Sequence, residues 1–138
     1  MLVTRKGMSL RFEASDEALR PTGRTTSGVR GIKLRSGDEL LTMEVVVDDA
    51  DFVVVTEGGY AKRTPLSEYR VQGRGGLGIK VANVREDRGA LVGALVTSGD
   101  EELLAAVKHR RQRWHFEVHR HVGRAEGGQH ILEVLLAQ

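Results

Sequence analysis

The amino-acid sequence predicts an all-β fold in which short strands form a repeat of about 50 residues. Three observations support this prediction. The 138 residues include 17 glycines and only 2 prolines, which favours many tight turns. Short segments alternate apolar and polar side chains, as half-buried strands do. Several blocks of sequence also recur in the same order at a nearly constant offset.

The clearest recurrence is a glycine-arginine motif. Gly23-Arg24-x-x-x-Gly28 is followed by Val29-Arg30, and Gly73-Arg74-x-x-x-Gly78 is followed by Ile79-Lys80, at an offset of 50. The segment from Lys6 to Arg11 aligns with Gly58 to Arg63 at an offset of 52, and Leu41–Val46 aligns with Leu91–Val96 at 50. A period near 50 is typical of propeller blades and related β arrays. We therefore expect a first repeat over 1–50, a second over 51–102, and a degenerate third repeat or atypical tail over 103–138.

The first repeat is expected to contain two strand regions and one short turn of helix. Met8, Leu10 and Phe12 alternate with polar residues and predict a strand. Residues 16–19 could form a helical turn that ends at Pro21. Residues 40–47 and 52–56 are rich in β-branched residues and predict a hairpin, with Asp48-Asp49-Ala50-Asp51 as its polar turn.

The second repeat follows the same plan. Glu57-Gly58-Gly59 predicts a turn that leads into a strand over 60–63. Residues 79–84 and 91–96 predict two more strands. No long amphipathic helix is expected before residue 102.

The tail after Glu102 has a different composition. Trp114, Phe116 and Val118 alternate as in a strand. A broken helical stripe fits equally well, through Leu103, Val107, Trp114, Val118 and Val122, so an irregular or partly helical tail is expected. A shifted reading frame in the coding sequence is one hypothesis for the change, which the nucleotides after codon 102 would test. His115, His119 and His121 suggest a metal, but no fourth ligand accompanies them, and we expect a solvated basic segment without metal.

Charge alternates in blocks along the chain. The net charge is +5 over residues 1–35, −7 over 36–57, +4 over 58–80, −3 over 81–102 and +3 over 103–138. If the chain folds back regularly, blocks of one sign can stack into a stripe, and a positive stripe is typical of a polyanion site. Solvated loops of either sign would explain the same pattern.

Composition narrows the class of protein. The absence of cysteine excludes a disulfide scaffold and a cysteine-based zinc site. No apolar run is long enough for a membrane span, and residues 1–12 lack the core of a signal peptide. We expect a soluble, cytoplasmic protein with no membrane partner.

The segment from Gln72 to Lys80 is the sharpest motif, with four glycines in six positions. Exposed backbone N–H groups in such a loop can bond phosphate oxygens, and Arg74 adds a forked cationic donor. A dinucleotide-binding G-x-G-x-x-G would require a following helix, which the sequence does not predict. A disordered RNA-binding segment fits poorly inside a repeat of strands, and an ordinary glycine turn remains the plain alternative.

These residues carry a resemblance to a known family. Residues 1–102 resemble the C-terminal domain of the DNA gyrase A protein, of an actinobacterial type, through Leu2–Gly7, Arg20–Val29 and Gln72–Lys80. The last segment is similar to the gyrase A box, Gln-(Arg/Lys)-Arg-Gly-Gly-(Arg/Lys)-Gly, with Gly73 and Leu77 in place of its two flanking basic residues. It looks like a secondary, weaker box.

The resemblance implies a β-pinwheel, a ring of propeller-like blades that share strands, here incomplete. It implies non-sequence-specific binding and wrapping of double-stranded DNA as part of a type IIA topoisomerase that introduces negative supercoils. The partners would be the remaining blades, the N-terminal domain and the gyrase B protein. The cleaving tyrosine and the ATP and Mg sites belong to other parts, so no catalytic residue or cofactor is expected in this chain. Tyr60 and Tyr69 are expected to be packing residues. The corresponding C-terminal domain of topoisomerase IV and a protein-interaction propeller remain the alternatives.

The predicted phosphate contacts are the basic side chains of both repeats together with the glycine loop. Arg24 and Arg74, at equivalent repeat positions, are expected to lie side by side. Because two repeats and a doubtful third leave strand edges open, low stability and aggregation are also expected. The candidate residues are Arg5, Lys6, Arg11, Arg24, Arg30, Lys33, Lys62, Arg63, Arg70, Gln72, Gly73, Arg74, Gly75, Gly76, Gly78 and Lys80.

Overall fold

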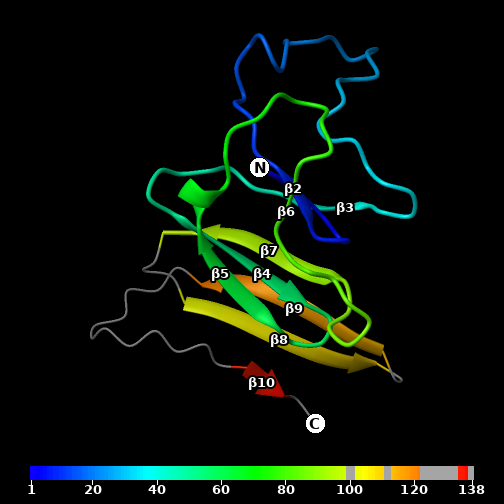
Figure 1. Ribbon diagram of the computed structural model, residues 1–138, viewed down its shortest axis with the longest axis vertical. Coiled ribbons are helices and arrows are strands. Elements are labelled where there is room, and N and C mark those ends of the chain that lie inside the picture. Colours follow the sequence, from blue (N-terminus) through cyan, green and yellow to red (C-terminus); the bar gives the residue numbers. More distant parts are fainter. Residues whose placement is uncertain (99–101, 111–112, 122–133, 137–138) are drawn as a thin grey trace.

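The computed structural model describes residues 1–98, 102–110, 113–121 and 134–136, with side chains described over 1–98. Its strands form three stacked sheets (Figure 1). The described residues contain one short 3-10 turn, η1 (Leu66–Glu68), and no α-helix. The predicted all-β class is therefore confirmed. No described helix is long and apolar enough to cross a membrane.

The first sheet has the strand order β3-β1-β2-β6. It contains β1 (Leu2–Thr4), β2 (Met8–Leu10), β3 (Leu40–Met43) and β6 (Ile79–Lys80), and all its neighbours are antiparallel. The second sheet has the order β5-β4-β7, with β4 (Asp51–Thr56), β5 (Ala61–Pro65) and β7 (Leu91–Thr97), also antiparallel. The third sheet contains β8 (Glu102–Arg110), β9 (Arg113–His121) and β10 (Val134–Leu136) in the order β10-β8-β9.

The repeat in the sequence is a repeat in the structure. In both sheets the first strand is followed by the same turn: Thr4 Oγ1 accepts from the Met8 N–H, and Thr56 Oγ1 accepts from the Tyr60 N–H, each at 3.2 Å. The glycine of each turn, Gly7 or Gly59, has φ +80° and donates its N–H to the threonine carbonyl. β1, β2 and β3 thus correspond to β4, β5 and β7. The boundaries at residues 50 and 102 remain a prediction.

The predicted hairpin across Asp48–Asp51 is wrong. β3 pairs with β1 in the first sheet, whereas β4 pairs with β5 and β7 in the second. Residues 44–50 therefore connect two sheets. Two adjacent strand patterns do not reveal whether the strands share a sheet, because a pleated strand presents the same alternation to any neighbour.

Three smaller expectations also differ. The predicted helical turn over 16–19 is a hydrogen-bonded turn without a helix, in which Leu19 N–H donates to the Ser15 carbonyl. The strand predicted over 79–84 is limited to Ile79–Lys80. The irregular or partly helical tail is instead a long antiparallel pair of β8 with β9, although residues 122–133 lie outside the described part. Over 113–121 the alternation of Trp114, Phe116 and Val118 belongs to a strand.

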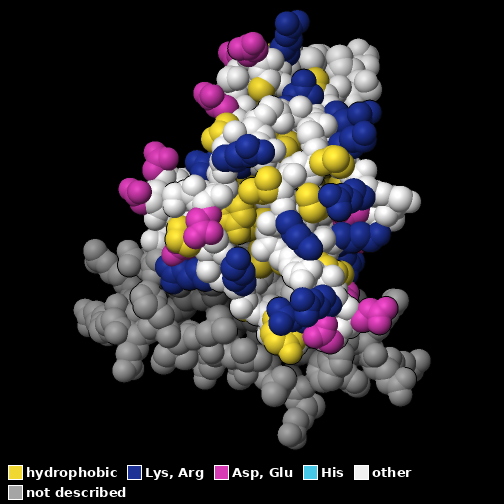
Figure 2. Space-filling view, viewed as in Figure 1, with side chains coloured by type: hydrophobic (Ala, Val, Ile, Leu, Met, Phe, Trp, Pro, Cys, Tyr) yellow, Lys and Arg dark blue, Asp and Glu magenta, His cyan; other side chains and the backbone are white. Residues whose placement is uncertain are grey.

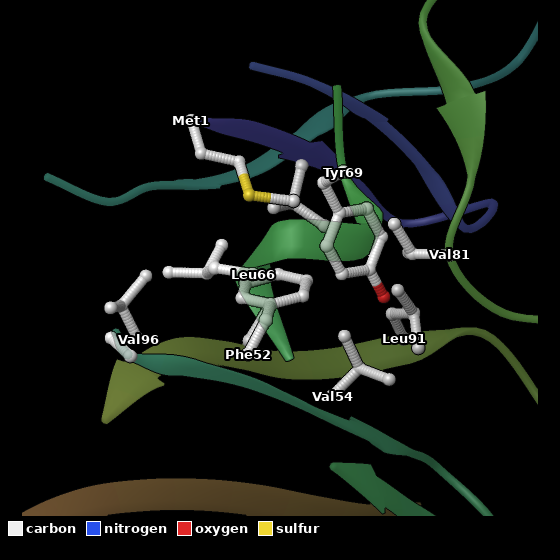
Figure 3. Close-up of a cluster of buried hydrophobic side chains, with 11 residues drawn as sticks. Met1, Phe52, Val54, Leu66, Tyr69, Val81, Leu91 and Val96 are labelled. Carbon is white, nitrogen blue, oxygen red and sulfur yellow. The ribbon is translucent and has the colours of Figure 1, made fainter. Parts of the chain in front are cut away.

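The main core lies between the first and second sheets (Figure 3). Phe52 is fully buried, and its ring meets Tyr69 edge to face, with 5.6 Å between centroids. Val53, Val55 and Leu95 form a second buried cluster. They alternate with Phe52 and Val54 along the strands, so they lie on the opposite face of the second sheet, toward the third sheet. Because β4 is buried on both faces, the core depends on neighbouring repeats, as in other repeat arrays.

Candidate nucleic-acid interface

The second glycine motif packs against the segment that follows the first one. Gly75 N–H donates to the Gly31 carbonyl at 2.7 Å, and Lys33 N–H donates to the Gly76 carbonyl at 2.8 Å. Arg74 Nη1 donates to the Arg30 carbonyl at 2.7 Å. These bonds place residues 30–33 beside residues 74–76. We call this pair of segments the loop pair.

The loop pair brings together three exposed cations from both repeats: Arg30, Lys33 and Arg74. Among the described residues, no carboxylate pairs with any of their side chains. Cations held close together without counter-charges repel each other, and a polyanion relieves that repulsion. The loop pair can therefore bind phosphate groups.

Arg74 is hydrogen-bonded to Arg30, and the expected side-by-side placement of Arg24 and Arg74 stays a prediction. Arg24 lies in the exposed turn between Gly23 and Thr26, and no described hydrogen bond joins it to Arg74. The second motif meets the chain just after the first motif, at Arg30, six residues beyond Arg24.

Part of the backbone of the glycine loop, residues 72–80, is already hydrogen-bonded within the protein. The N–H of Gly75 is already donated to Gly31, so it is not available to a phosphate. Gly78 has φ +75°, and a Cβ there would stand 2.1 Å from the Ser9 carbonyl oxygen, so this glycine is needed for close packing on β2. Gly73 has open space around it, and Gly76 lies near the Leu10 side chain. Gln72 donates its backbone N–H to the Arg11 carbonyl.

Several predicted contacts have partners within the protein. Arg5 donates to Glu39 and Glu57, each at 3.1 Å, and so joins the two repeats. Arg11 Nη1 donates to the carbonyls of Leu66 and Tyr69. Arg63 pairs with Asp51. These three guanidinium groups have a structural role in the described protein.

The remaining candidates are exposed. Lys6 Nζ donates to the Ser36 carbonyl at 2.9 Å, and Lys80 Nζ donates to Asn83 Oδ1 at 2.9 Å, which leaves both ammonium groups without a carboxylate in the described residues. Arg24, Lys62 and Arg70 are exposed and have no described side-chain partner. Arg35, two residues after Lys33, is a further exposed cation that was not among the predicted contacts.

Basic side chains are frequent on one face of the molecule (Figure 2). In this view Lys and Arg gather along the centre and right, and Asp and Glu lie mostly toward the margins. The negative block over 36–57 is partly neutralised, since Glu39, Asp51 and Glu57 pair with arginines. On this face, basic side chains therefore gather apart from most acidic side chains, although some acidic side chains lie among them.

The two tyrosines differ. Tyr69 is 5% exposed and packs on Phe52, as predicted for a packing residue. Tyr60 is 51% exposed, and the Arg88 guanidinium lies 4.8 Å from the centre of its ring. The three tail histidines lie in β9, whose side chains are outside the described part, so the prediction about metal stays untested.

Comparison with known proteins identifies the family. A family model described as "DNA gyrase C-terminal domain, beta-propeller" matches residues 1–46 and 50–98. The DNA gyrase A protein of Streptomyces coelicolor is 59% identical over 105 residues, and that of Mycolicibacterium smegmatis is 53% identical over the same length. Each match covers 76% of this chain and 12% of the relative, so the chain spans about an eighth of the length of these relatives.

Two solved structures share the fold. A DNA gyrase A C-terminal domain has a TM-score of 0.67 and 30% identity, covering 85% of this chain and 39% of that one. The C-terminal domain of a DNA topoisomerase IV has a TM-score of 0.68 at 19% identity, covering 99% and 41%, and shows the fold alone. The repeated strands, the shared strand β6 and the matched family model agree: this chain belongs to the family of DNA gyrase C-terminal domains.

Proposed function

We propose that this chain binds double-stranded DNA without sequence preference and bends it as one part of a DNA-wrapping domain. The observation that carries the proposal is the loop pair, where cations of two repeats meet without carboxylate partners among the described residues. Family membership supports the same conclusion. Phosphate contacts of this kind release counterions and make the affinity fall with salt.

The assigned residues differ in how much we expect each to contribute to DNA binding. Arg30, Lys33 and Arg74 form the centre of the interface, and Arg24, Lys62, Arg70 and Lys80 extend it. Arg5, Arg11 and Arg63 contribute less, since their guanidinium groups already have partners. Bending a short DNA site costs about 1–6 kcal/mol, which further contacts along the array would offset.

We infer that the wider role is that of a gyrase A protein in the cytoplasm. The chain itself would then supply wrapping together with further blades, while the N-terminal domain would supply strand cleavage and the gyrase B protein would supply ATP hydrolysis. The burial of Tyr69 supports a packing role for its ring, whereas the half-exposed Tyr60 ring contacts the Arg88 guanidinium.

The test is a series of gel shifts with unrelated duplexes at several salt concentrations. Arg74→Gln should weaken binding equally on all sequences and lower the slope of log affinity against log salt by about 1. Arg63→Gln is the matched control, because it removes the same charge from a guanidinium that is bound to Asp51. Equal effects of the two variants would show that only net charge matters and would refute the loop pair as a site.

A plasmid topology assay tests the bending. Nicked plasmid closed by ligase in the presence of the chain should show a change of linking number with one consistent sign. Binding without any such change would refute wrapping, and the absence of binding at about 50–100 mM salt would favour a protein-interaction role.

A further inference from the structure

Arg5 and Glu57 occupy equivalent positions in the two repeats but carry opposite charges. Each follows the threonine of the repeated turn, at an offset of 52. Their backbones make equivalent bonds, since Arg5 N–H donates to the Glu39 carbonyl at 3.0 Å and Glu57 N–H donates to the Ala90 carbonyl at 2.9 Å. Two like charges at this position would repel each other, whereas the guanidinium and the carboxylate attract.

Three hydrogen bonds connect the two positions in a closed ring. Arg5 Nη2 donates to Glu57 Oε1 at 3.1 Å. Glu57 Oε2 accepts from the Ala90 N–H at 3.1 Å, and the N–H of the next residue, Leu91, donates to the Arg5 carbonyl at 2.9 Å. We call these four residues the clamp. The clamp joins the end of β1 in the first sheet to the end of β4 and the start of β7 in the second.

Both charged side chains of the clamp are also held from their own side. Arg5 Nη1 donates to Glu39 Oε1 at 3.1 Å, and Glu39 directly precedes β3 in the first sheet. Gly89 has φ +72°, and a Cβ there would stand 2.6 Å from the Glu57 Cβ, so the loop before β7 closes tightly on the Glu57 side chain. The bonds of the clamp therefore have a fixed direction at each end.

The clamp contributes direction more than stability. The side chains of Arg5 and Glu57 are 39% and 42% exposed, and ion pairs with such exposure add little to the free energy of unfolding. The apolar cluster between the first and second sheets supplies the burial, but hydrophobic contact has no preferred direction, and packed elements can slide on each other.

A second directional contact lies at the other end of β2. Arg11 directly follows β2, and its Nη1 donates to the carbonyls of Leu66 and Tyr69 at 3.0 and 3.3 Å, next to the end of β5 in the second sheet. The clamp includes Arg5, in the turn before β2. Two directional contacts at opposite ends of one strand fix the angle between the sheets, which one contact alone would leave free to turn.

We propose that the clamp sets the angle between the first and second sheets and thereby the path that bound DNA follows from one repeat to the next. Arg5 and Glu57 then act as positioning residues. The statement about DNA rests on the proposed function, whereas the statement about the angle does not. Without the clamp, the loop pair would still bind phosphates, but the cations of the two repeats would lose their single fixed arrangement.

Four variants separate orientation from charge. Glu57→Gln and Arg5→Gln break the clamp from its two sides and change the net charge in opposite directions. Asp51→Asn and Arg63→Gln are the matched controls, because they break an ion pair that lies within the second sheet and make the same two changes in net charge. The two clamp variants should share an effect that neither control shows.

The angle is measured without DNA by pulsed electron paramagnetic resonance on the full chain. The chain has no cysteine, so Met43→Cys in the first sheet and Ala61→Cys in the second, both exposed, accept a pair of spin labels. Both clamp variants should broaden the distribution of distances between the labels, and both controls should leave it unchanged. An unchanged distribution in the two clamp variants would overturn the proposal.

The path of DNA is measured by the linking-number change of ligated plasmid per bound chain, with the unlabelled variants. The clamp variants should reduce this change to about half or less, while their affinity for DNA differs little from that of the control with the same charge. Equal linking-number changes in clamp and control variants would contradict the assigned role. If the unaltered chain binds no DNA, the proposed function fails, and the spin-label distances still decide whether the clamp sets the angle.

Discussion

Phe52→Ala is the sharpest test of how the repeats hold together. Phe52 is fully buried at the centre of the cluster between the first and second sheets, and it contacts the Tyr69 ring edge to face. Removing the ring would leave a cavity between the first and second sheets. The strands of each sheet are hydrogen-bonded to other strands of the same sheet, so the two sheets cannot close the cavity without moving those strands.

The expected loss of unfolding free energy follows from this burial. A Phe→Ala change in a core costs about 3–5 kcal/mol, and loss of the aromatic pair places this case toward the upper end. Domains are typically stable by about 5–15 kcal/mol, so the variant would lose a large part of its stability. Val45→Ala, at a residue 84% exposed, should change stability by less than about 0.5 kcal/mol.

Urea unfolding followed by far-UV circular dichroism measures both variants. The midpoint should fall strongly for Phe52→Ala and little for Val45→Ala, at a similar slope. A loss below about 1 kcal/mol for Phe52→Ala would refute the view that the inter-sheet cluster is the main core.

Three further predictions use the same assay. Arg5→Ala removes pairs with two partly exposed carboxylates, so it should cost less than about 1 kcal/mol, and a loss above about 2 kcal/mol would contradict the exposed geometry. Gly78→Ala should destabilise the protein by more than about 1 kcal/mol, because its Cβ would meet the Ser9 carbonyl at positive φ. Gly73→Ala is the control and should be nearly neutral, because there is open space around Gly73. Equal effects of the two variants would count against a role of Gly78 in placing β6 beside β2. Thr56→Val removes the acceptor of the Tyr60 N–H and should cost about 1–3 kcal/mol of unfolding free energy. Thr4→Val should have a similar effect, because Thr4 makes the same bond in the first repeat. A neutral result for both variants would argue against the repeated turn.

Local chemistry in the sequence was sufficient to predict the repeat and the main strands of residues 1–98, although not the tail strands or the length of β6. The alternation around Met8 and the β-branched runs in β4 and β7 require pleated segments with a buried side. The offset of 52 aligned Gly7 with Gly59, and in the structure both turns have the same φ and the same threonine bond. These features depend on residues close in the chain, so their sequence order reveals them.

Only the tertiary structure decided which strand joins which sheet and which cations remain available. β3 and β4 are neighbours in sequence but lie in different sheets, and Ile79–Lys80 inserts beside Met8 and Ser9. The same long-range packing pairs Arg5, Arg11 and Arg63 with oxygen atoms while it brings Arg74 beside Arg30. A sequence pattern specifies that a strand has a buried face and that an arginine is charged. The partner of each is set by contacts between residues far apart in the chain, which no local pattern contains.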